Sequence, residues 1–514
     1  MAETSSHLKA VHGNEKILSG PGENNSLEMT VSLVHGDASE LKKRFTSLNI
    51  LAVCVTLMAT WEAIGAVFVG GLVSGGPVAL LYGYILAFIG TIATCLSLAE
   101  LASLCPSSGG QNEWTSILAP PDYAPFFSWL TGWITTLGWQ VFTGSAAFLG
   151  GLQIQGLVVL NYPDYAPKRW QGTLMYWAIL LVSWLVNTVG IKLMPLVENG
   201  VLFFHVLTFL AVLIPLVVLS PHKNADFVFT SFDNNSGWSS DGVAWCLGLL
   251  SATYVLAGYD GSCHLSEEMH NPSVVLPRIM IGTVLINGTL GLGFLFALLF
   301  CLGNIDSILS SSTGFPIIQI YYNSTGSTAA TVALMMPSIL IAIASTFGLL
   351  ASSSRTLWAF ARDKGIPFSD YFAHVDKGSS LPNRSIAFSV IFLALLGLIN
   401  IGSTTAFNAI VSLAVVALYT SYLIPIILHA IRRVRGPPLT YGPFRLGVFG
   451  LPLNIFATIY SIFIVIFLFF PPYQPVTAVN MNYACVVFGA VVIFSIFWWF
   501  VRGRKTYTGS ARQE

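Results

Sequence analysis

Long runs of apolar residues alternate with short polar stretches between about residue 48 and residue 501. A helix needs about 20 apolar residues to cross a lipid bilayer, so each run predicts one membrane-spanning helix. The ninth and tenth runs are separated only by the stretch STTA, and this boundary is the least sharp. Twelve runs reach the required length: 48–73, 79–104, 123–150, 172–193, 196–220, 242–268, 279–303, 328–357, 386–402, 406–431, 448–470 and 482–501. The pattern therefore predicts an all-α membrane protein with twelve transmembrane helices.

The composition agrees with a chain that is surrounded mostly by lipid. Hydrophobic residues make up 54% of the 514 positions and charged residues only 9%, whereas soluble domains carry about 25% charged residues. The formal net charge is 0, which gives no indication of a nucleic-acid partner. The seven cysteines show no CxxC pair or other metal-ligand spacing, so we interpret them as buried thiols and expect no cofactor.

The positions of lysine and arginine predict the direction in which the helices cross. If the N-terminus is placed inside and the helices alternate, only Lys168, Arg169 and Lys223 of the 23 basic residues fall outside. Cytoplasmic loops are enriched in lysine and arginine, so this orientation is favoured over its reverse. Residues 1–45 are then a disordered cytoplasmic tail and residues 502–514 a second cytoplasmic tail. The expected location is the plasma membrane.

Two of the predicted helices carry a carboxylate and glycines in their middle. Glu62 lies in ATWEAIGAVFVGG, and the apolar runs on either side of it are too short to cross alone. Asp260 lies in AGYDGSCHLSEE, directly after an apolar run. Interruptions of this kind in corresponding helices of two repeats are the best sequence indication of a transporter binding site. Residues 46–220 and 241–431 are therefore predicted to form two inverted repeats of five helices, and 448–501 two further helices.

The ends of the interrupted helices predict what would bind there. Backbone N–H groups that start a half-helix favour a carboxylate, and carbonyl groups that end one favour an ammonium group. A charge at this depth is costly and usually functional, and neighbouring aromatic rings would add cation–π attraction. Alternatively, Glu62 is protonated or braces a neighbouring helix, Asp260 caps the half-helix that follows, and the aromatic side chains are ordinary packing. The predicted substrate-binding residues are Trp61, Glu62, Ala63, Gly65, Tyr254, Gly258, Tyr259 and Asp260.

Four motifs occur in order along the chain: TWEAIG, SLAELASLCPSSGGQNEW, AGYDGSCHLSEEMHNP and SRTLWAFARDKGIPFS. Together they resemble the amino acid/polyamine/organocation transporters, and within them the fungal amino acid–choline transporter branch, which includes GABA and choline permeases. The resemblance extends from about residue 45 to residue 503. It implies a LeuT-type fold with a 5+5 inverted repeat, in which helices 1 and 6 are broken at the midplane and hold the substrate. It does not specify the substrate, so choline, GABA and α-amino acids all remain open.

The same resemblance bears on the coupled ion. Some relatives carry a lysine in helix 5, six residues after an asparagine, where it takes the place of a sodium ion. Counting six residues from Asn199 reaches His205, which would titrate near neutral pH and is predicted to carry a coupled proton. Alternatively, His205 is a neutral histidine bonded within the core. Sodium coupling is the rival and would use Ser345 and Thr346 of helix 8, unless these hydroxyls bond back to the preceding turn.

The inner ends of helices 6 and 8 carry opposite charges. Glu267 and Glu268 end helix 6 and Arg355 ends helix 8. A salt bridge between these glutamates and Arg355 is a candidate inner gate, with Glu267 and Arg355 as the named gate residues, and a static surface pair is an equally good interpretation. The stretch HLSEEMH matches no metalloprotease motif, so we do not expect an enzyme. We predict a secondary active transporter that imports a small amino compound, coupled to protons, with a sodium-coupled transporter and a transporter-like nutrient sensor as alternatives.

Overall fold

The structure is a computed structural model that describes residues 41–509 except residues 403–405 and 479. The named elements of this part of the chain are helices, and strand-like pairing within it is limited to isolated bridges such as Phe45 with Met269. The predicted all-α class is therefore confirmed. Most of the predicted N-terminal tail and the last five residues of the predicted C-terminal tail lie outside the described residues.

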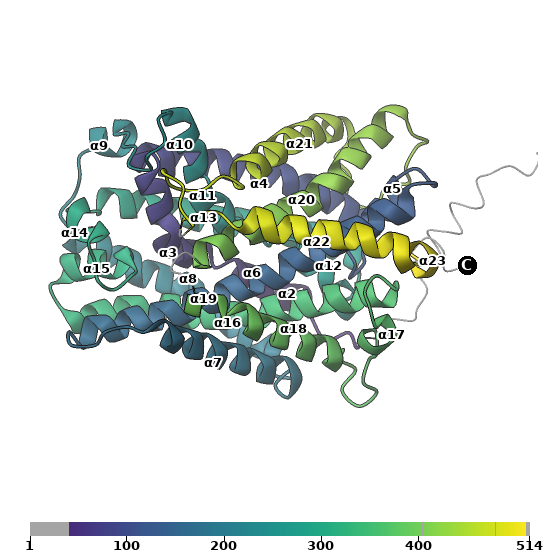
Figure 1. The fold of residues 1–514 in the computed structure, drawn as a ribbon, viewed down its shortest axis with the longest axis horizontal. Helices are drawn as coiled ribbons and strands as arrows, with labels where there is room; N and C mark the ends of the chain where they lie inside the picture. The colour runs from purple at the N-terminus through teal and green to yellow at the C-terminus, as the bar shows by residue number, and fades with distance from the viewer. Residues whose placement is uncertain (1–40, 403–405, 479, 510–514) are drawn as a thin grey trace, which may run out of the picture. The chain divides into compact units, whose positions relative to one another are not determined.

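Figure 1 labels the helices in chain order. The first part contains α2 (Ser47–Met58), α3 (Thr60–Val73), α4 (Gly76–Leu104), α5 (Gln111–Leu118), α6 (Ala124–Asn161), α7 (Arg169–Thr188), α8 (Met194–Leu219) and α9 (Ala225–Thr230). The middle part contains α10 (Asp241–Gly248), α11 (Leu250–Val255), α12 (Gly261–His264), the short 3-10 helix η1 (Ser266–Glu268), α13 (Pro272–Phe300), α14 (Ile305–Leu309), α15 (Pro316–Thr325), α16 (Thr328–Arg362) and α17 (Ser369–Phe372). The last part contains α18 (Asn383–Leu396), α19 (Ile399–Gly402), α20 (Ala406–Arg435), η2 (Gly447–Phe449), α21 (Gly450–Phe467), α22 (Ala484–Trp498), the π-helical turn η3 (Trp499–Gly503) and α23 (Arg504–Thr506).

Ten helices in the described part of the chain are long and apolar enough to cross a membrane. The two remaining predicted spans correspond to α7 and to the segment from α10 to α12. Tryptophan, tyrosine, glutamine and asparagine are interspersed along α7, and the second segment is divided into pieces of 8, 6 and 4 residues. The protein is thus a multi-pass membrane protein, whereas the predicted number of twelve spans is not confirmed.

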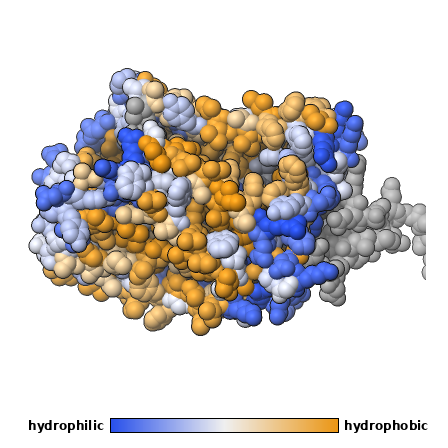
Figure 2. Space-filling model, turned by 60° about the horizontal axis from the view of Figure 1, so that its bottom comes forward, coloured by the Kyte–Doolittle hydropathy of each residue, from blue (hydrophilic) through white to orange (hydrophobic). Residues whose placement is uncertain are grey.

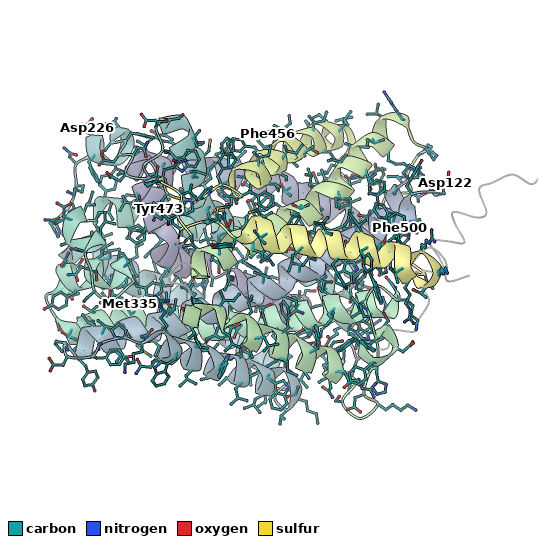
Figure 3. The ribbon with its side chains drawn as sticks, in the orientation of Figure 1. Asp122, Asp226, Met335, Phe456, Tyr473 and Phe500 are labelled. Carbon is teal, nitrogen blue, oxygen red and sulfur yellow. The ribbon has the colours of Figure 1, made fainter. Side chains whose placement is uncertain are left out.

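A broad apolar band separates two polar ends on one face of the molecule (Figure 2). The long helices α6, α7, α16 and α22 run along the direction that joins these ends (Figure 1), and α6 packs against the other three. Asp226 of α9 and Asp122 before α6 lie at opposite ends (Figure 3). Large apolar side chains are strongly exposed between the ends, such as Phe203 of α8 at 71% and Ile493 of α22 at 69%. Such an exposed apolar surface is suited to contact with lipid.

The first predicted interruption lies at Ala59. Thr46 caps the start of α2 in a reciprocal arrangement with Asn49, and α2 ends where Ala59 adopts a left-handed conformation with φ 44° and ψ 47°. An alanine in this conformation is uncommon, because the side chain crowds its own backbone, and such strain is concentrated at functional sites. The new helix α3 begins at Thr60, so the break lies three residues before Glu62 rather than at it.

The second predicted interruption is wider. Helix α11 ends at Val255 and α12 begins at Gly261, which leaves five residues between them outside any helix. Gly258 in this gap has φ +95°, and a side chain at this position would place its Cβ 2.6 Å from the ring of Phe142. Glycine is therefore required here both for the backbone conformation and for the close approach of α6.

Helix α6 packs against both pieces of the second interrupted helix. It contacts α5, α7, α16, α20 and α22. Phe142 packs edge-on against Tyr254 on one side of the gap, with ring centroids 5.6 Å apart. Trp139 packs in the same manner against His264 on the other side, at 5.0 Å. Aromatic contacts of this geometry stabilise packing beyond their buried area, so both pieces of the broken helix are positioned against one rigid element.

Candidate functional site

The two interrupted helices meet at their breaks. The hydroxyl of Thr60, at the start of α3, donates to the carbonyl oxygen of Val255, at the end of α11, at 2.7 Å. The carbonyl groups of the last turn of a helix lack partners within that helix. The bond from Thr60 satisfies one of them and holds the start of one half-helix against the end of the other.

Asn287 of α13 bridges the first break. Its side-chain nitrogen donates to the carbonyl oxygen of Val55 at 3.2 Å, and its side-chain oxygen accepts from the backbone N–H of Thr60 at 3.4 Å. One amide therefore pairs a group on each side of Ala59, which offsets the loss of helical hydrogen bonds in an apolar environment. Asn287 is not among the residues predicted from the sequence, although an asparagine in the middle of an apolar run is a usable signal.

Glu62 and His205 form a buried pair beside the first break. The Nδ1 atom of His205 lies 2.7 Å from Oε1 of Glu62, and both side chains are almost completely buried. The other ring nitrogen of His205 and the other oxygen of Glu62 have no hydrogen-bond partner among the described residues. The pair therefore retains one free position on each side, one for a proton and one for a cation or hydrogen-bond donor.

Trp61 faces α8 and α13. Its ring packs edge-on against Phe209 at 5.9 Å, and it also contacts His205 at 6.1 Å and Phe294 at 5.4 Å between centroids. The indole is completely buried and is not among the residues that line the cavity described below. Its contacts place it behind the Glu62–His205 pair, where it supports the orientation of the imidazole ring.

Helix α8 also holds the other side of the first break. Glu198 is completely buried, and its Oε2 accepts from the hydroxyl of Thr56 in α2 at 2.7 Å. Glu198 and His205 lie two turns apart on α8, so they fall on the same face. One face of α8 therefore contacts α2 through Glu198 and α3 through His205, on either side of Ala59.

A small closed cavity lies at the first break. It measures about 20 Å³ and is bordered by Glu62, Ala63, Tyr254, Ser345 and Gln153. This space accommodates about one water molecule. Four of the predicted site residues, from α3, α11 and α16, therefore line one cavity. An amino compound requires a larger space, so the helices around the cavity must separate before a substrate of this class enters.

Three other predicted residues lie away from this cavity. Gly65 faces Ile317 of α15, which lies 3.1 Å from the position a Cβ atom would take. Gly258 faces Phe142. Tyr259 packs against Tyr422 of α20, with ring centroids 5.6 Å apart. All three allow close packing of neighbouring helices around the breaks.

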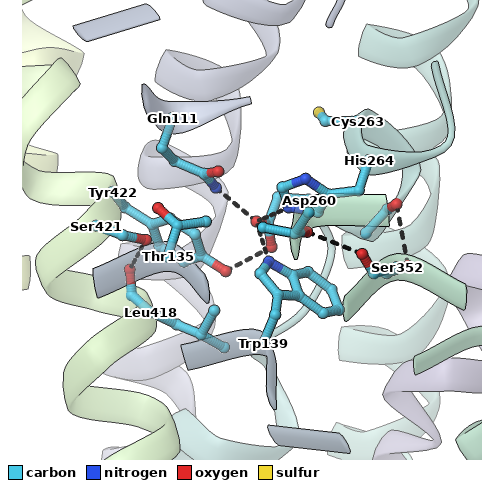
Figure 4. Close-up of polar contacts among 12 residues, drawn as sticks. Gln111, Thr135, Trp139, Asp260, Cys263, His264, Ser352, Leu418, Ser421 and Tyr422 are labelled. Carbon is cyan, nitrogen blue, oxygen red and sulfur yellow. Dashed lines mark hydrogen bonds and ion pairs between the residues drawn. The ribbon is translucent and has the colours of Figure 1, made fainter. Parts of the chain in front are cut away.

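Asp260 is enclosed by donors from three helices (Figure 4). Its carboxylate accepts from the side-chain nitrogen of Gln111 in α5 at 2.6 Å, from the indole of Trp139 in α6 at 3.2 Å and from the hydroxyl of Tyr422 in α20 at 2.5 Å. Nε2 of His264 lies 3.5 Å from the same carboxylate. The side chain is completely buried and does not line the small cavity.

The geometry of Asp260 differs from a helix cap. It occupies the position before α12, but its side chain makes no capping hydrogen bond to that helix. Instead, the carboxylate joins the second break to three other helices by hydrogen bonds: to α5 through Gln111 of the PSSGGQNEW segment, to α6 and to α20. A buried carboxylate with several donors is well satisfied, so Asp260 is suited to fixing the position of the broken helix.

Ser345 and Thr346 of α16 point to different surroundings. Ser345 lines the small cavity, and its hydroxyl bonds back to the carbonyl of Ala342 at 2.9 Å. The hydroxyl of Thr346 bonds back to Ile343 at 2.6 Å and also contacts the hydroxyl of Ser183 in α7. Both hydroxyls therefore make the back-bonds that the sequence analysis gave as the alternative to a sodium site.

Ion pairs gather at the end of the molecule where α12, η1 and the end of α16 lie. The predicted gate residue Arg355 is completely buried and pairs with Glu268, with Nε to Oε1 at 2.9 Å. Glu267, the other predicted gate residue, pairs with Arg362 at 3.0 Å. Arg362 also lies 3.6 Å from Glu113 of α5. Arg355 thus pairs with Glu268, one of the two glutamates expected at this end, whereas the named gate residue Glu267 pairs with Arg362.

Two carboxyl groups at this end are held away from water. Burial raises the pKa of Glu113 above its usual 4.5, although the positive charge of Arg362 acts in the opposite direction. Burial and the negative charge of Glu113 raise the pKa of Asp363 from 3.8 to about 8. Glu113 and Asp363 therefore bind protons more readily than exposed carboxylates do.

A second, larger cavity lies beside the C-terminal half of α3. It measures about 450 Å³ and is lined by Ala66 and Gly70 of α3, Gln155 and Gly156 of α6, and Ser251 of α11, among others. This volume falls in the range of about 300–1,000 Å³ that is typical of small-molecule sites. Helices α3 and α11 border both cavities, although the two cavities share no lining residue.

Comparison with known proteins shows which protein family this chain is similar to. A family model described as amino acid permease matches residues 45–491. The chain belongs to the amino acid permease family. This result confirms the resemblance that the four sequence motifs predicted, and it supports transport of an amino acid or organocation by this permease.

Curated relatives of the permease are similar over nearly its whole length. The choline transporter of Saccharomyces cerevisiae is 32% identical over 470 residues, which cover 91% of this chain and 83% of that protein. Amino-acid permease 2 of Neurospora crassa is 30% identical, with 90% of this chain and 84% of that protein covered. Amino-acid permease BAT1 of Arabidopsis thaliana is also 30% identical, with 92% and 94% covered. The names of these relatives describe transport rather than catalysis.

Proposed function

We propose that this permease is a secondary active transporter that imports a small amino compound by alternating access and couples import to protons. The observation that carries the proposal is the buried contact of His205 with Glu62 beside a helix break that borders a cavity. A histidine changes charge near neutral pH. A carboxylate at this depth requires a cationic or donor partner.

The proposed substrate position lies at the first break. The free oxygen of Glu62 would accept the ammonium group, and Tyr254 and Phe142 border the same cavity with their aromatic rings. The first N–H groups of α3 lie next to it and favour a carboxylate. Choline would contact only Glu62 and the aromatic rings, whereas GABA or an α-amino acid would also use the N–H groups of α3 for its carboxylate. The relatives named for choline and for amino acids agree with this class of substrate.

The proposed coupling follows from the charge of the pair. With a proton on His205, the imidazolium neutralises Glu62 in a compact ion pair. Without that proton, Glu62 carries an uncompensated charge in a space that holds about one water molecule, which is unfavourable in such surroundings. The proton thus changes the relative stability of the arrangements of α3 against α8, and a transporter needs such a bias to couple proton and substrate movement.

The proposed transport cycle alternates between the two ends of the molecule. The cavity beside the C-terminal half of α3 supplies an approach from one end. At the other end, the pairs of Arg355 with Glu268 and Arg362 with Glu267 close the path. The two interrupted helices and the order of the elements fit a LeuT-type 5+5 repeat with the boundaries given above. The lysine and arginine positions favour cytoplasmic termini, with the plasma membrane as the proposed location.

Two alternatives predict different measurements. A sodium-coupled transporter would use Ser345 with carbonyl groups of the first break, because Ser345 does line the cavity. A nutrient sensor would bind the compound without accumulating it. The test is uptake of radiolabelled choline, GABA, arginine and spermidine into proteoliposomes under an imposed pH gradient or sodium gradient. Accumulation driven by the pH gradient supports the proposal. Accumulation driven only by sodium, or binding without accumulation, contradicts it.

A further inference from the structure

A basic groove lies at the end of the molecule where α2 and α8 begin. It is a cavity of about 640 Å³ formed by three chain segments: the strap before α2, the turn between α7 and α8, and the turn at 378–380. The basic side chains that line it are Lys42, Lys43, Arg44 and Lys192. Four cations from two separate segments therefore converge on one cavity, which is electrostatically unfavourable without an anion.

Among the described residues, the carboxylate of Asp376 lies in the turn next to the groove but is not one of the side chains that line it. Asp376 lies in the adjoining turn, where Lys377 follows it directly, and it accepts from the backbone and hydroxyl of Ser379. Arg44 donates from its Nη2 to the carbonyl oxygen of Ser379, and its buried Nε has no hydrogen-bond partner among the described residues. The groove thus offers an unused arginine donor as well as three lysines. Arginine and lysine donors of this kind suit phosphate oxygens.

Apolar side chains flank the groove on the side of α8. Val189, Leu193 and Leu196 are 81%, 62% and 72% exposed. Val189 itself lines the groove, and Leu193 lies between the lining residues Lys192 and Pro195. A site for a soluble anion has no need of such neighbours, whereas the acyl chains of a lipid would cover them. The lysine and arginine positions place this end at the cytoplasmic leaflet, which is rich in anionic lipids.

We propose that the basic groove binds the phosphate head group of an anionic membrane lipid. The backbone N–H groups of Arg44 and Phe45 both donate to the carbonyl oxygen of Glu268, at 3.0 and 3.2 Å. Glu268 in turn pairs with the buried Arg355. The bound lipid therefore anchors the strap that connects the groove to this ion pair, and it stabilises the arrangement in which that end is closed.

The test measures lipid binding by the purified full-length protein in a neutral detergent, and it does not depend on transport. The unfolding temperature is recorded during titration with dioctanoyl phosphatidylserine, dioctanoyl phosphatidylcholine or inorganic phosphate. We expect only phosphatidylserine to raise it. The variant Lys42→Gln/Lys43→Gln/Lys192→Gln should require on the order of 100-fold more phosphatidylserine, because each basic side chain near an anionic surface strengthens binding about fivefold.

The matched control is Arg502→Gln/Arg504→Gln/Lys505→Gln, which removes three exposed positive charges beyond α22. It should respond to phosphatidylserine like the wild type. The proposal is overturned if the lysine variant also responds like the wild type, if the control loses the response equally, or if phosphatidylcholine is as effective as phosphatidylserine. An equal effect of inorganic phosphate would assign the groove to a free anion instead of a lipid. If the triple variant does not fold, Lys192→Gln alone provides the same comparison.

Discussion

His205 of α8 and Glu62 of α3 form a contact of 2.7 Å between Nδ1 and Oε1, three residues beyond the break at Ala59. The contact joins a titratable ring to a carboxylate that borders a cavity. Glu198 makes the equivalent contact with α2, through Thr56. Helix α8 therefore contacts the chain on both sides of the break through ionisable side chains.

Glu62→Gln is expected to reduce uptake to near background while folding and delivery to the membrane remain intact. Glutamine keeps the size of the side chain but removes its charge, and a lost charge-assisted hydrogen bond corresponds to about a 10- to 100-fold loss. The measurement is uptake of the identified substrate together with surface quantification. Asp122→Asn, at an exposed carboxylate, is the control and should transport normally. Normal uptake by Glu62→Gln would assign Glu62 a purely structural role.

His205→Ala is expected to uncouple uptake from external pH, because it removes the group that carries the proton next to Glu62. His205→Lys should also flatten the pH profile while retaining a permanent positive charge, and therefore more activity than His205→Ala. The measurement is the initial uptake rate across pH 5 to 8. If the alanine variant keeps the pH profile of the wild type, His205 is not the coupling residue.

Asn287→Leu is expected to destabilise the first break. The variant leaves the Thr60 N–H without its partner, whereas the Val55 carbonyl keeps only the bond from the Ala59 N–H. An unpaired buried group costs about 1–3 kcal/mol. A lower unfolding temperature and reduced uptake should follow. Asn161→Leu, at the exposed end of α6, is the comparison and should have little effect on either. Unchanged stability of Asn287→Leu would show that the break does not depend on this amide.

Arg355→Met is expected to lower stability strongly, because it leaves Glu268 buried without its partner. Removing one member of a buried ion pair costs about 3–5 kcal/mol, whereas replacing both by apolar residues is often neutral. The double variant Arg355→Met/Glu268→Leu should therefore recover most of the unfolding temperature. It should still leak substrate in proteoliposomes if this pair closes the path. A double variant that transports without leak would limit the pair to a structural role.

Asp363→Asn is expected to stabilise the protein at high pH. The folded-state pKa of Asp363 is raised to about 8 from 3.8, so the unfolded side chain ionises at lower pH than the folded one. Stability is therefore lost as pH rises between these two values. The asparagine variant should unfold at a higher temperature than the wild type near pH 8 and at the same temperature near pH 4. A constant difference at all pH values would contradict the assignment.

The sequence was sufficient for the membrane-spanning class, because about 20 apolar residues in succession have few alternatives to a helix across lipid. The sequence also located both interrupted helices, since a carboxylate inside an apolar run is costly to bury in a membrane and usually marks a functional position. The break itself is three residues before Glu62, at an alanine that no sequence pattern distinguishes. The groups on either side of it bond to Asn287, more than two hundred residues away in the chain.

Tertiary structure decided which side chains share a cavity. Glu62 and Asp260 look alike in the sequence, because each is a carboxylate next to glycine at an interruption of an apolar run. In the structure, Glu62 borders the cavity, whereas Asp260 is enclosed by Gln111, Trp139 and Tyr422. The surroundings of the two carboxylates differ because α5, α6 and α20 supply hydrogen-bond donors to Asp260 and not to Glu62. Local sequence indicated which apolar runs are interrupted, because glycines and a carboxylate stand together in each of them, but it did not fix the residue at which the first helix breaks. Long-range packing determines which side chains contact the ends of the half-helices, because those contacts join residues that are distant in the chain.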